Sequence, residues 1–399
     1  MDNVQQNQIV QNKKPSSALD KNINQPKHEK QIVRVKSGVD IPFLVIVIVL
    51  LCLGAVMIYS ASYAYAEKYS HDIKAYIEPH LMYAAIGLAA MYLVSHIDYM
   101  TLKRFAYVIF IGVLLLMILT AIPGIGKVHH GARRWFEIGP ISFQPSELMK
   151  LAIILAFAKY YVENPAKNKK FVPGILIPGI VIAMIAVIML FQSHMSGLII
   201  LAAVAVIMMF LGGCNALWLG AGGLAGGVAV YFIFVTGYRS DRIAAWLDPW
   251  KFAKDEGWQT IQSLYSISQG GIFGTGIGES LQKNLYLPEP QNDFIFAIWC
   301  EELGFVGAVL VIILFGLLVW RGIKIALGSP NKYASYVVLG IVLKVALQAL
   351  LNMAVVTNTI PNTGISLPFF SYGGTSLLFL MIEMGIVLSV SRYSYLEKG

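Results

Sequence analysis

Several apolar runs of about 20 residues constrain this chain more than any other feature, because each can cross the ~30 Å hydrocarbon core of a bilayer as a helix. A water-soluble fold would have to bury all of them with little charge to cover its surface, since 57% of the 399 residues are hydrophobic and 13% are charged. The mean hydropathy of +0.66 agrees. The sequence therefore predicts an all-α, polytopic integral membrane protein.

The apolar runs predict about ten spans behind a polar tail. Residues 1–40 are rich in Gln, Asn and Lys and lack apolar periodicity, so a disordered tail is expected there. The transmembrane domain is expected over residues 41–395. Although Ala64-Tyr65-Ala66 resembles a signal-peptidase site, the first run is too long for a cleaved signal. The expected spans are 41–62, 79–97, 104–123, 146–163, 173–191, 197–212, 216–237, 294–320, 333–356 and 369–391.

The distribution of Lys and Arg orients these spans. An even number of spans places both termini on one side of the membrane. Of the 30 Lys and Arg residues, 18 fall on that side, 10 fall on the other side, and Lys150 and Lys344 lie within spans. Positive charge is enriched in cytoplasmic loops, so both termini are expected in the cytoplasm. The net charge of +8 is thus a topology signal and does not indicate a nucleic-acid surface.

Cofactor sites are not indicated by the sequence. Cys52, Cys214 and Cys300 have neither disulfide nor zinc spacing and are expected to be small buried side chains. No arrangement of histidines is typical of a metal site. No cofactor is predicted with certainty, and the sequence leaves open whether a divalent cation takes part.

The first long extracytoplasmic loop, 124–145, leads into a charged motif. Gly131-Ala-Arg-Arg-Trp135 is followed by Phe143-Gln-Pro-Ser-Glu147 and then by Lys150. Glu147 and Lys150 are three residues apart and so share one helix face. Arg134 and Lys150 could neutralise a phosphate group. The alternative is an interfacial Arg-Trp belt with a lysine that extends to the membrane surface.

The second long extracytoplasmic loop, 238–293, ends in a glycine-rich stretch and an acid. Gly274, Gly276 and Gly278 follow no strand, so they predict close backbone packing or an anion contact instead of a nucleotide site. Asp293 lies at the mouth of the eighth span, where desolvation raises the proton affinity of a carboxylate, as a general base requires. The alternative role of Asp293 is the N-cap of that helix.

Three further features concern charges and breaks near the spans. Glu301-Glu302 is expected near the outer mouth, partly buried, with one carboxylate orienting a basic partner. The stretch 362–376 enters the last span through Pro368 and a glycine pair, either as backbone that lines a cavity or as a simple helix start. Lys344 and Glu383 both lie ~15 Å from the cytoplasmic ends of their spans, which predicts a structural ion pair between them.

These motifs, in this order, resemble the SEDS family of shape, elongation, division and sporulation proteins, which includes FtsW, RodA and SpoVE. The similarity covers roughly residues 40–395. It rests on Gly-Ala-x-Arg-Trp with Gln-Pro-Ser-Glu-x-x-Lys, and on Gln-Ser with Gly-Gly-x-x-Gly-x-Gly-x-Gly. It rests also on Leu-Pro-Glu-x-x-x-Asp-Phe-Ile-Phe-Ala with Glu-Glu-x-Gly, and on Thr-Gly-x-x-Leu-Pro-Phe-x-Ser-Tyr-Gly-Gly. The last two motifs look closer to the FtsW/SpoVE branch than to RodA.

The resemblance implies a peptidoglycan glycosyltransferase of the bacterial cytoplasmic membrane that polymerises lipid II in division or sporulation. It implies that Asp293 is the general base. Expected partners are lipid II, the undecaprenyl-pyrophosphate-linked glycan and a class B penicillin-binding protein. The residues expected to contact substrate are Arg134, Lys150, Glu147, Gln144, Gln262, Ser263, Lys283, Glu289, Glu302, Ser371, Gly373 and Gly374.

The chain departs from the family pattern in two places. Gln291-Asn292 stands where many members have His-Thr, and Gln192-Ser-His-Met-Ser-Gly197 stands where many have an acidic residue. No functional acid is therefore expected in the latter loop. Two other functions stay open from the residues alone. A lipid II flippase would depend on charges inside the membrane such as Lys344, and a division scaffold would not need Asp293.

Overall fold

The computed structural model describes residues 32–36, 38–129, 132–138, 141–236, 240–255 and 257–397. Most of the expected tail, residues 1–31 and 37, lies outside the described residues, as does Gly131 of the first motif. The elements in chain order are β1 (Ile32–Lys36), α1 (Ile41–Ser70), α2 (Ile77–His96), α3 (Tyr99–Ala121), β2 (Lys127–His129), β3 (Ala132–Ile138), β4 (Ile141–Phe143), α4 (Pro145–Glu163), the π-helical turn η1 (Val172–Leu176), α5 (Ile177–Phe191), α6 (Met195–Leu211), α7 (Ala216–Thr236), α8 (Ser240–Leu247), the 3₁₀ turn η2 (Pro249–Phe252), α9 (Trp258–Gly270), α10 (Ile295–Leu327), α11 (Lys332–Val356), α12 (Gly374–Ser391) and β5 (Tyr393–Glu397).

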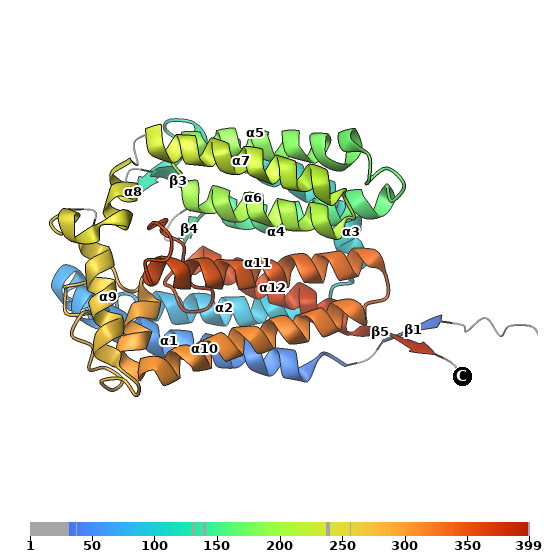
Figure 1. Ribbon diagram of the computed structural model, residues 1–399. Helices are drawn as coiled ribbons and strands as arrows, with labels where there is room; N and C mark the ends of the chain where they lie inside the picture. Colours follow the sequence, from blue (N-terminus) through green and yellow to red (C-terminus); the bar gives the residue numbers. More distant parts are fainter. Residues whose placement is uncertain are drawn as a thin grey trace, which may run out of the picture.

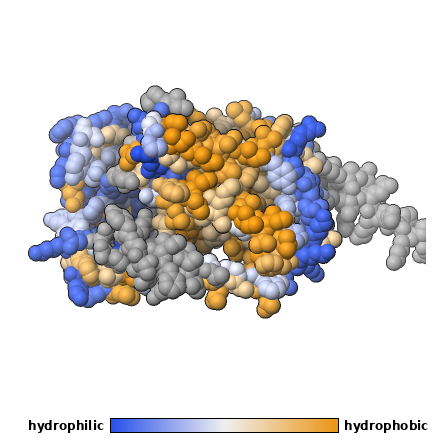
Figure 2. Space-filling view, turned by 90° about the horizontal axis from the view of Figure 1, so that it is seen from above, coloured by the Kyte–Doolittle hydropathy of each residue, from blue (hydrophilic) through white to orange (hydrophobic). Residues whose placement is uncertain are grey.

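The ten predicted spans are confirmed as helices: α1 to α4, η1 with α5, α6, α7, α10, α11 and α12. Within the described residues, seven of them are long and apolar enough to cross a membrane. The others include α6, which is apolar but has 17 residues, and α4, which carries Glu147, Lys150, Lys159 and Glu163. Figure 2 shows an apolar band across the middle of the molecule between two hydrophilic ends, as a membrane protein requires.

The helices lie side by side along one axis, with different elements at the two ends (Figure 1). At the terminal end, β1 pairs with β5. At the opposite end, here called the loop end, lie β2 to β4, α8 and α9. Helix α12 is enclosed, with 72% of its apolar window buried, whereas α2 and α3 are each 22% buried. The last helix therefore forms part of the core, and α2 and α3 present most of their apolar surface to lipid.

A break inside α10 explains the glycine-rich stretch of the second loop. Gly304 leaves helical geometry with φ 65° and ψ −163°. The loop backbone fills the break: Thr275 N donates to Glu301 O (2.9 Å), and Phe305 N donates to Gly271 O (2.9 Å). A Cβ at Gly274, where φ is +84°, would lie 2.1 Å from Glu302 O. The predicted close backbone packing is therefore confirmed at Gly274. The loop also supplies hydrogen bonds that the broken helix lacks.

Besides the β1–β5 pair, two smaller features differ from the predictions made from the sequence. The first long loop contains an antiparallel sheet in the order β2-β3-β4, in which Phe136 pairs with Phe143. This short sheet satisfies the loop's backbone hydrogen bonds close to the membrane. Cys214 and Cys300 are buried as predicted, but Cys52 is exposed on α1, and all three are free.

At the terminal end, an ion pair joins the start of α1 to the last turns of α10. The carboxylate of Asp40 caps α1 by accepting a hydrogen bond from Phe43 N (3.0 Å). It also accepts two from Arg321, at 2.8 Å from Nε and 2.7 Å from Nη2. The bidentate contact fixes the helix that enters the bundle against the helix that leaves the second long loop.

Candidate active site

Asp293 lies where segments far apart in sequence meet at the loop end. The side chain of Asn352, near the end of α11, donates from Nδ2 to Asp293 O (2.7 Å) and to Ile365 O (2.7 Å). Tyr372 N donates to Gln291 O (2.8 Å). The loop before α10 is therefore tied to the segment that leads into α12 both at Gln291 and, through Asn352, at Asp293 itself.

The carboxylate of Asp293 is half-buried directly before α10. Phe294 occupies the N-cap position of that helix, without a side-chain cap hydrogen bond, so the geometry does not favour the capping role. Gly364, with φ 68°, lies against the acid, and a Cβ there would be 3.0 Å from Asp293 Oδ2. The absence of a side chain at Gly364 thus lets the loop approach the carboxylate closely.

Arg134 is the cation whose charge is coupled to Asp293. It is half-buried on β3, and burial lowers the pKa of its guanidinium, while the charges of Asp293 and Glu147 act in the opposite direction. Its Nε is buried and has no hydrogen-bond partner among the described residues. A buried donor without a partner is costly, so this guanidinium retains hydrogen-bonding capacity that a ligand could use.

Glu147 and Lys150 form an ion pair in the first turns of α4. Lys150 Nζ lies 2.8 Å from Glu147 Oε1 and 2.9 Å from Oε2. The predicted shared helix face is confirmed. Lys150 is only 3% exposed, so it does not extend to the membrane surface as the alternative interpretation required. Glu147 thus contacts Lys150 directly, and its charge also acts on Arg134.

The predicted contact between Lys344 and Glu383 is also confirmed. The two side chains form a buried ion pair between α11 and α12. The charges of Glu147 and Lys150 act on both of them, so the two pairs form one buried charge cluster. In an apolar environment, paired charges of this kind avoid the large cost of an isolated ion.

A small cavity connects the charge cluster to the last motif. It holds about 20 Å³, which is roughly the room that one water molecule needs. Its lining residues are Glu147, Lys344, Gln348, Ser366, Leu367, Pro368, Phe369, Ser371, Ser376, Leu377 and Leu380. The segment around Pro368 therefore lines a cavity within the protein, as the broken backbone of this stretch predicts.

For Lys283 and Glu302 the sequence predicts substrate contacts, whereas the structure pairs them with each other. Lys283 Nζ lies 3.0 Å from Glu302 Oε1, and it also donates to Ser60 Oγ (3.0 Å) and Gly278 O (2.5 Å). Both side chains are buried, at 6% and 0% exposure. The expectation that one acid of the Glu301-Glu302 pair orients a basic partner is confirmed for Glu302. We assign this pair to holding the glycine-rich loop against α1 and α10.

Glu301 stabilises the same loop through a second set of hydrogen bonds. Its carboxylate accepts hydrogen bonds from Ser266 Oγ (2.6 Å), Ser280 Oγ (2.6 Å) and Leu281 N (2.7 Å). A buried carboxylate with three such donors is well satisfied. It joins α9, the loop and α10 into one unit behind Asp293.

The other predicted substrate residues occupy different surroundings. Ser263 Oγ donates to Val356 O (2.7 Å), and Gln262 beside it is buried. Gln144 is buried with Nε2 3.5 Å from His194 Nε2. Glu289 is half-buried and accepts from Asn292 Nδ2 (2.8 Å). Three of these four residues thus contact neighbouring residues of the protein.

The residues of the last motif shape the backbone beside the site. Ser371 Oγ accepts from Leu367 N (2.7 Å), which closes the turn around Pro368. A Cβ at Gly374 would lie 2.3 Å from the ring of Tyr83, and one at Gly373 would lie 2.5 Å from Ser376 Oγ. Both glycines thus permit tight packing at the start of α12.

Two residues near the site carry no motif signal in the sequence. Asn352 is fully buried and positions both Asp293 and the following loop, and its amide inside an apolar span is the signal that could have indicated it. His194 precedes α6, in the stretch 192–197, and contacts Gln144. Within the described part of the chain, no group of three or more His, Cys, Asp or Glu side chains is placed to hold a metal ion.

Sequence comparisons identify close relatives of the whole transmembrane domain. The model of a family described as "Cell cycle protein", FtsW/RodA/SpoVE, matches residues 42–396. Stage V sporulation protein E of Bacillus subtilis is 41% identical over 90% of this chain and 98% of its own length. A probable peptidoglycan glycosyltransferase FtsW of Geobacter sp. strain M18 is 38% identical over 90% of this chain and 98% of its own length.

Solved structures share the fold. A chain from a peptidoglycan synthase complex that coordinates polymerization and crosslinking has a TM-score of 0.71 at 26% identity, over 89% of this chain and 98% of that chain. The rod shape determining protein RodA of Thermus thermophilus has a TM-score of 0.67 at 26% identity, over 89% of this chain and 97% of that chain. The arrangement of helices around Asp293 is therefore a shared architecture.

Proposed function

Because this chain belongs to the FtsW/RodA/SpoVE family, we propose that it is a peptidoglycan glycosyltransferase that joins lipid II disaccharide-peptide units into β-1,4 glycan strands. The relatives named as probable peptidoglycan glycosyltransferases support the reaction. The similarity to a stage V sporulation protein and to FtsW proteins supports a role in wall synthesis during division or sporulation. The observation that carries the proposal is the half-buried acid Asp293, whose charge acts on the half-buried guanidinium of Arg134.

Asp293 acts as the general base in this proposal. Its carboxylate takes the proton from a hydroxyl of the acceptor sugar, and the hydroxyl oxygen forms the new bond to the anomeric carbon of the donor. The bond from that carbon to the pyrophosphate oxygen breaks, and its electron pair leaves with undecaprenyl pyrophosphate. The hydrogen bond from Asn352 to Asp293 O holds the backbone that carries the acid, and the close approach of Gly364 limits the space around the carboxylate, which favours the attacking geometry.

Arg134 binds the pyrophosphate of the donor. A guanidinium matches phosphate oxygens geometrically, and the buried Nε of Arg134 has a donor to offer. Lys150 contributes positive charge next to Glu147, with which it forms an ion pair. We leave Lys283 out of this group because its ammonium already donates to Glu302 Oε1, Ser60 Oγ and Gly278 O, which uses all three of its donors.

The reaction takes place at the outer face of the cytoplasmic membrane. We infer this orientation from the excess of Lys and Arg on the side of the termini, which makes the loop end extracytoplasmic. A class B penicillin-binding protein is the proposed partner, since a structural neighbour was solved within a peptidoglycan synthase complex. Both termini are then cytoplasmic.

A lipid II flippase is the alternative function, and the buried charge cluster is the feature that favours it. A flippase would need a polar path for a disaccharide through the middle of the bilayer. Lys344 and Glu383 are instead paired with each other, and the cavity beside them has room for roughly one water molecule. This packing supports the polymerase.

Polymerisation of labelled lipid II by the purified full chain, alone and with its transpeptidase partner, tests the proposal. Asp293→Asn is expected to abolish glycan ladders while the protein stays folded. The matched control is Asp248→Asn, which removes an exposed carboxylate of the same loop and keeps the cap of η2; it is expected to retain activity. Polymer from Asp293→Asn at the native rate would remove Asp293 as the base, and no polymer under any condition would favour the flippase.

A further inference from the structure

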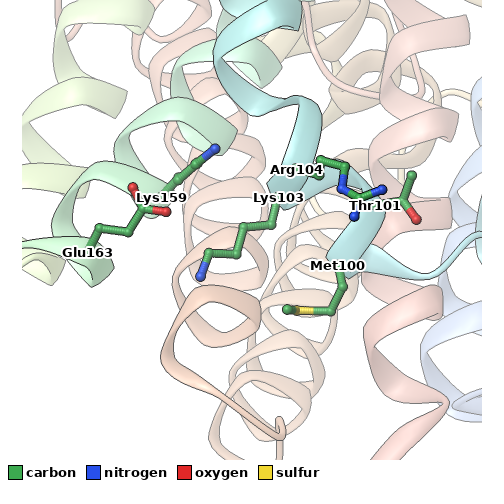
Figure 3. A pocket seen from close by; sticks show the side chains of 6 residues that line it. All are labelled: Met100, Thr101, Lys103, Arg104, Lys159 and Glu163. Carbon is green, nitrogen blue, oxygen red and sulfur yellow. The ribbon is translucent and has the colours of Figure 1, made fainter.

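A pocket separate from the candidate active site opens between α3 and α4 at the terminal end. It holds about 470 Å³, a volume typical of ligand sites. Figure 3 shows that its lining side chains come from the first two turns of α3 and the last turns of α4. The lining residues are Met100, Thr101, Lys103, Arg104, Lys159 and Glu163.

The pocket is cationic, and its cations keep hydrogen-bond donors available. Three of the lining side chains are basic and one is acidic. Lys159 Nζ lies 4.5 Å from the centre of the Tyr107 ring, and Lys103 Nζ lies 5.9 Å from the centre of the Tyr333 ring. Among the residues that the structure describes, none of the three cations forms an ion pair. The pocket can therefore accept an anion without breaking an existing salt bridge.

An apolar stripe continues from the pocket along α3. Val108, Ile111 and Leu115 are 66%, 55% and 55% exposed. Together with Arg104 they follow the spacing i, i+4, i+7, i+11, which places all four side chains on one face of the helix. A ligand bound in the pocket would thus find a cationic site followed by an exposed apolar surface.

The depth of the pocket matches the headgroup region of a bilayer. Lys103 and Arg104 lie four and five residues after the start of α3 at Tyr99, or ~6–8 Å along the helix axis. Basic pockets between transmembrane helices at the cytoplasmic side are suited to anionic headgroups. A soluble phosphate would satisfy the cations but would leave the stripe without an occupant.

We propose that this pocket binds the phosphate headgroup of an anionic phospholipid, whose acyl chains lie along Val108, Ile111 and Leu115. The site lies away from Asp293, and the inference does not depend on the proposed glycosyltransferase function. Zwitterionic lipids are expected to bind more weakly because their ammonium group opposes the basic side chains.

Native mass spectrometry of the full chain in detergent, titrated with phosphatidylglycerol, tests the proposal. The pocket variant carries Lys103→Gln, Arg104→Gln and Lys159→Gln. The control variant carries Lys167→Gln, Lys169→Gln and Lys170→Gln, which removes three exposed charges from the same end of the molecule outside the pocket. The pocket variant is expected to weaken binding of the lipid at least about tenfold, and the control variant about twofold or less.

Three results would overturn the proposal. Equal weakening in both variants would indicate diffuse attraction, and unchanged binding in the pocket variant would place the lipid elsewhere. Displacement of the lipid by inorganic phosphate alone would indicate a site for soluble anions. Melting temperatures verify that each variant is folded. If the triple variant unfolds, the single change Arg104→Gln, at an exposed residue, is measured in its place. Weakening of lipid binding by at least about threefold would then support the pocket, and no weakening would contradict it.

Discussion

Arg133 and Arg134 are adjacent on β3 and therefore point to opposite faces of the strand. The aliphatic part of Arg133 packs near Gly126, whereas the charge of Arg134 interacts with Asp293 and Glu147. The two residues thus allow the effect of a charge at the site to be separated from that of a charge on the same hairpin.

We expect Arg134→Gln to lower kcat/KM for lipid II about 100-fold, as when a donor to developing negative charge is lost. Arg133→Gln is expected to lower it about threefold or less. Steady-state polymerisation kinetics of both variants make the comparison. Equal losses in the two variants would mean that the hairpin needs charge in general and that Arg134 has no special role.

Gly364 offers a second test at the scale of one residue. Alanine at this position is strained by the positive φ and places a Cβ 3.0 Å from Asp293 Oδ2. Gly271→Ala is the matched control, because Gly271 also has a positive φ but nothing within 4 Å of an added Cβ. Each change is expected to cost ~1–3 kcal/mol of stability.

Only Gly364→Ala should lower the polymerisation rate by more than about tenfold, since small displacements of reacting groups are costly. The measurement combines melting temperatures with rates for both variants. A Gly364→Ala protein with native activity would show that the position of the Asp293 carboxylate is not critical.

Among the elements, the glycine-rich loop and the broken helix α10 stabilise each other. Lys283 and Glu302 hold this assembly through a buried ion pair. Lys283→Met leaves the carboxylate buried without its partner and is expected to cost ~3–5 kcal/mol. The double change Lys283→Met with Glu302→Leu should restore most of the melting temperature and keep polymerase activity within a few-fold. A stable but inactive double variant would instead indicate that Lys283 binds the pyrophosphate of the donor.

The pair between α11 and α12 gives a corresponding prediction inside the membrane. Lys344→Ala alone leaves Glu383 buried and uncompensated, so it should reduce folding yield and melting temperature more than Lys344→Ala with Glu383→Ala. A double variant that is equally or less stable than the single one would rule out a structural ion pair as the role of these charges.

At the scale of the whole molecule, the sequence predicts the spans well and their interruptions poorly. Span ends agree with the helices within a few residues for most spans, because apolar length alone determines where a helix can cross. The break at Gly304 depends on hydrogen bonds from residues about 30 positions earlier, and the β2-β3-β4 sheet depends on pairing within a polar loop. Such contacts leave no periodic signal in the chain.

The sequence predicts the residues of the candidate site about as well as it predicts the fold. Asp293, Arg134 and Glu147 stand out as charges beside apolar spans, and the family pattern groups them. The sequence could not distinguish Lys150 and Lys283, which serve different partners, because an ion pair depends on spatial neighbours. Asn352 and Gly364 gain their importance only from the position of Asp293 in three dimensions.

A structure of Asp293→Asn bound to lipid II at the loop end is the measurement that tests the central claim most directly. The variant should bind the substrate without consuming it. We predict that the pyrophosphate lies within hydrogen-bond distance of Arg134 and that an acceptor sugar hydroxyl faces the amide at position 293. Lipid II bound instead between α11 and α12, beside Lys344 and away from Arg134, would contradict a polymerase centred on Asp293.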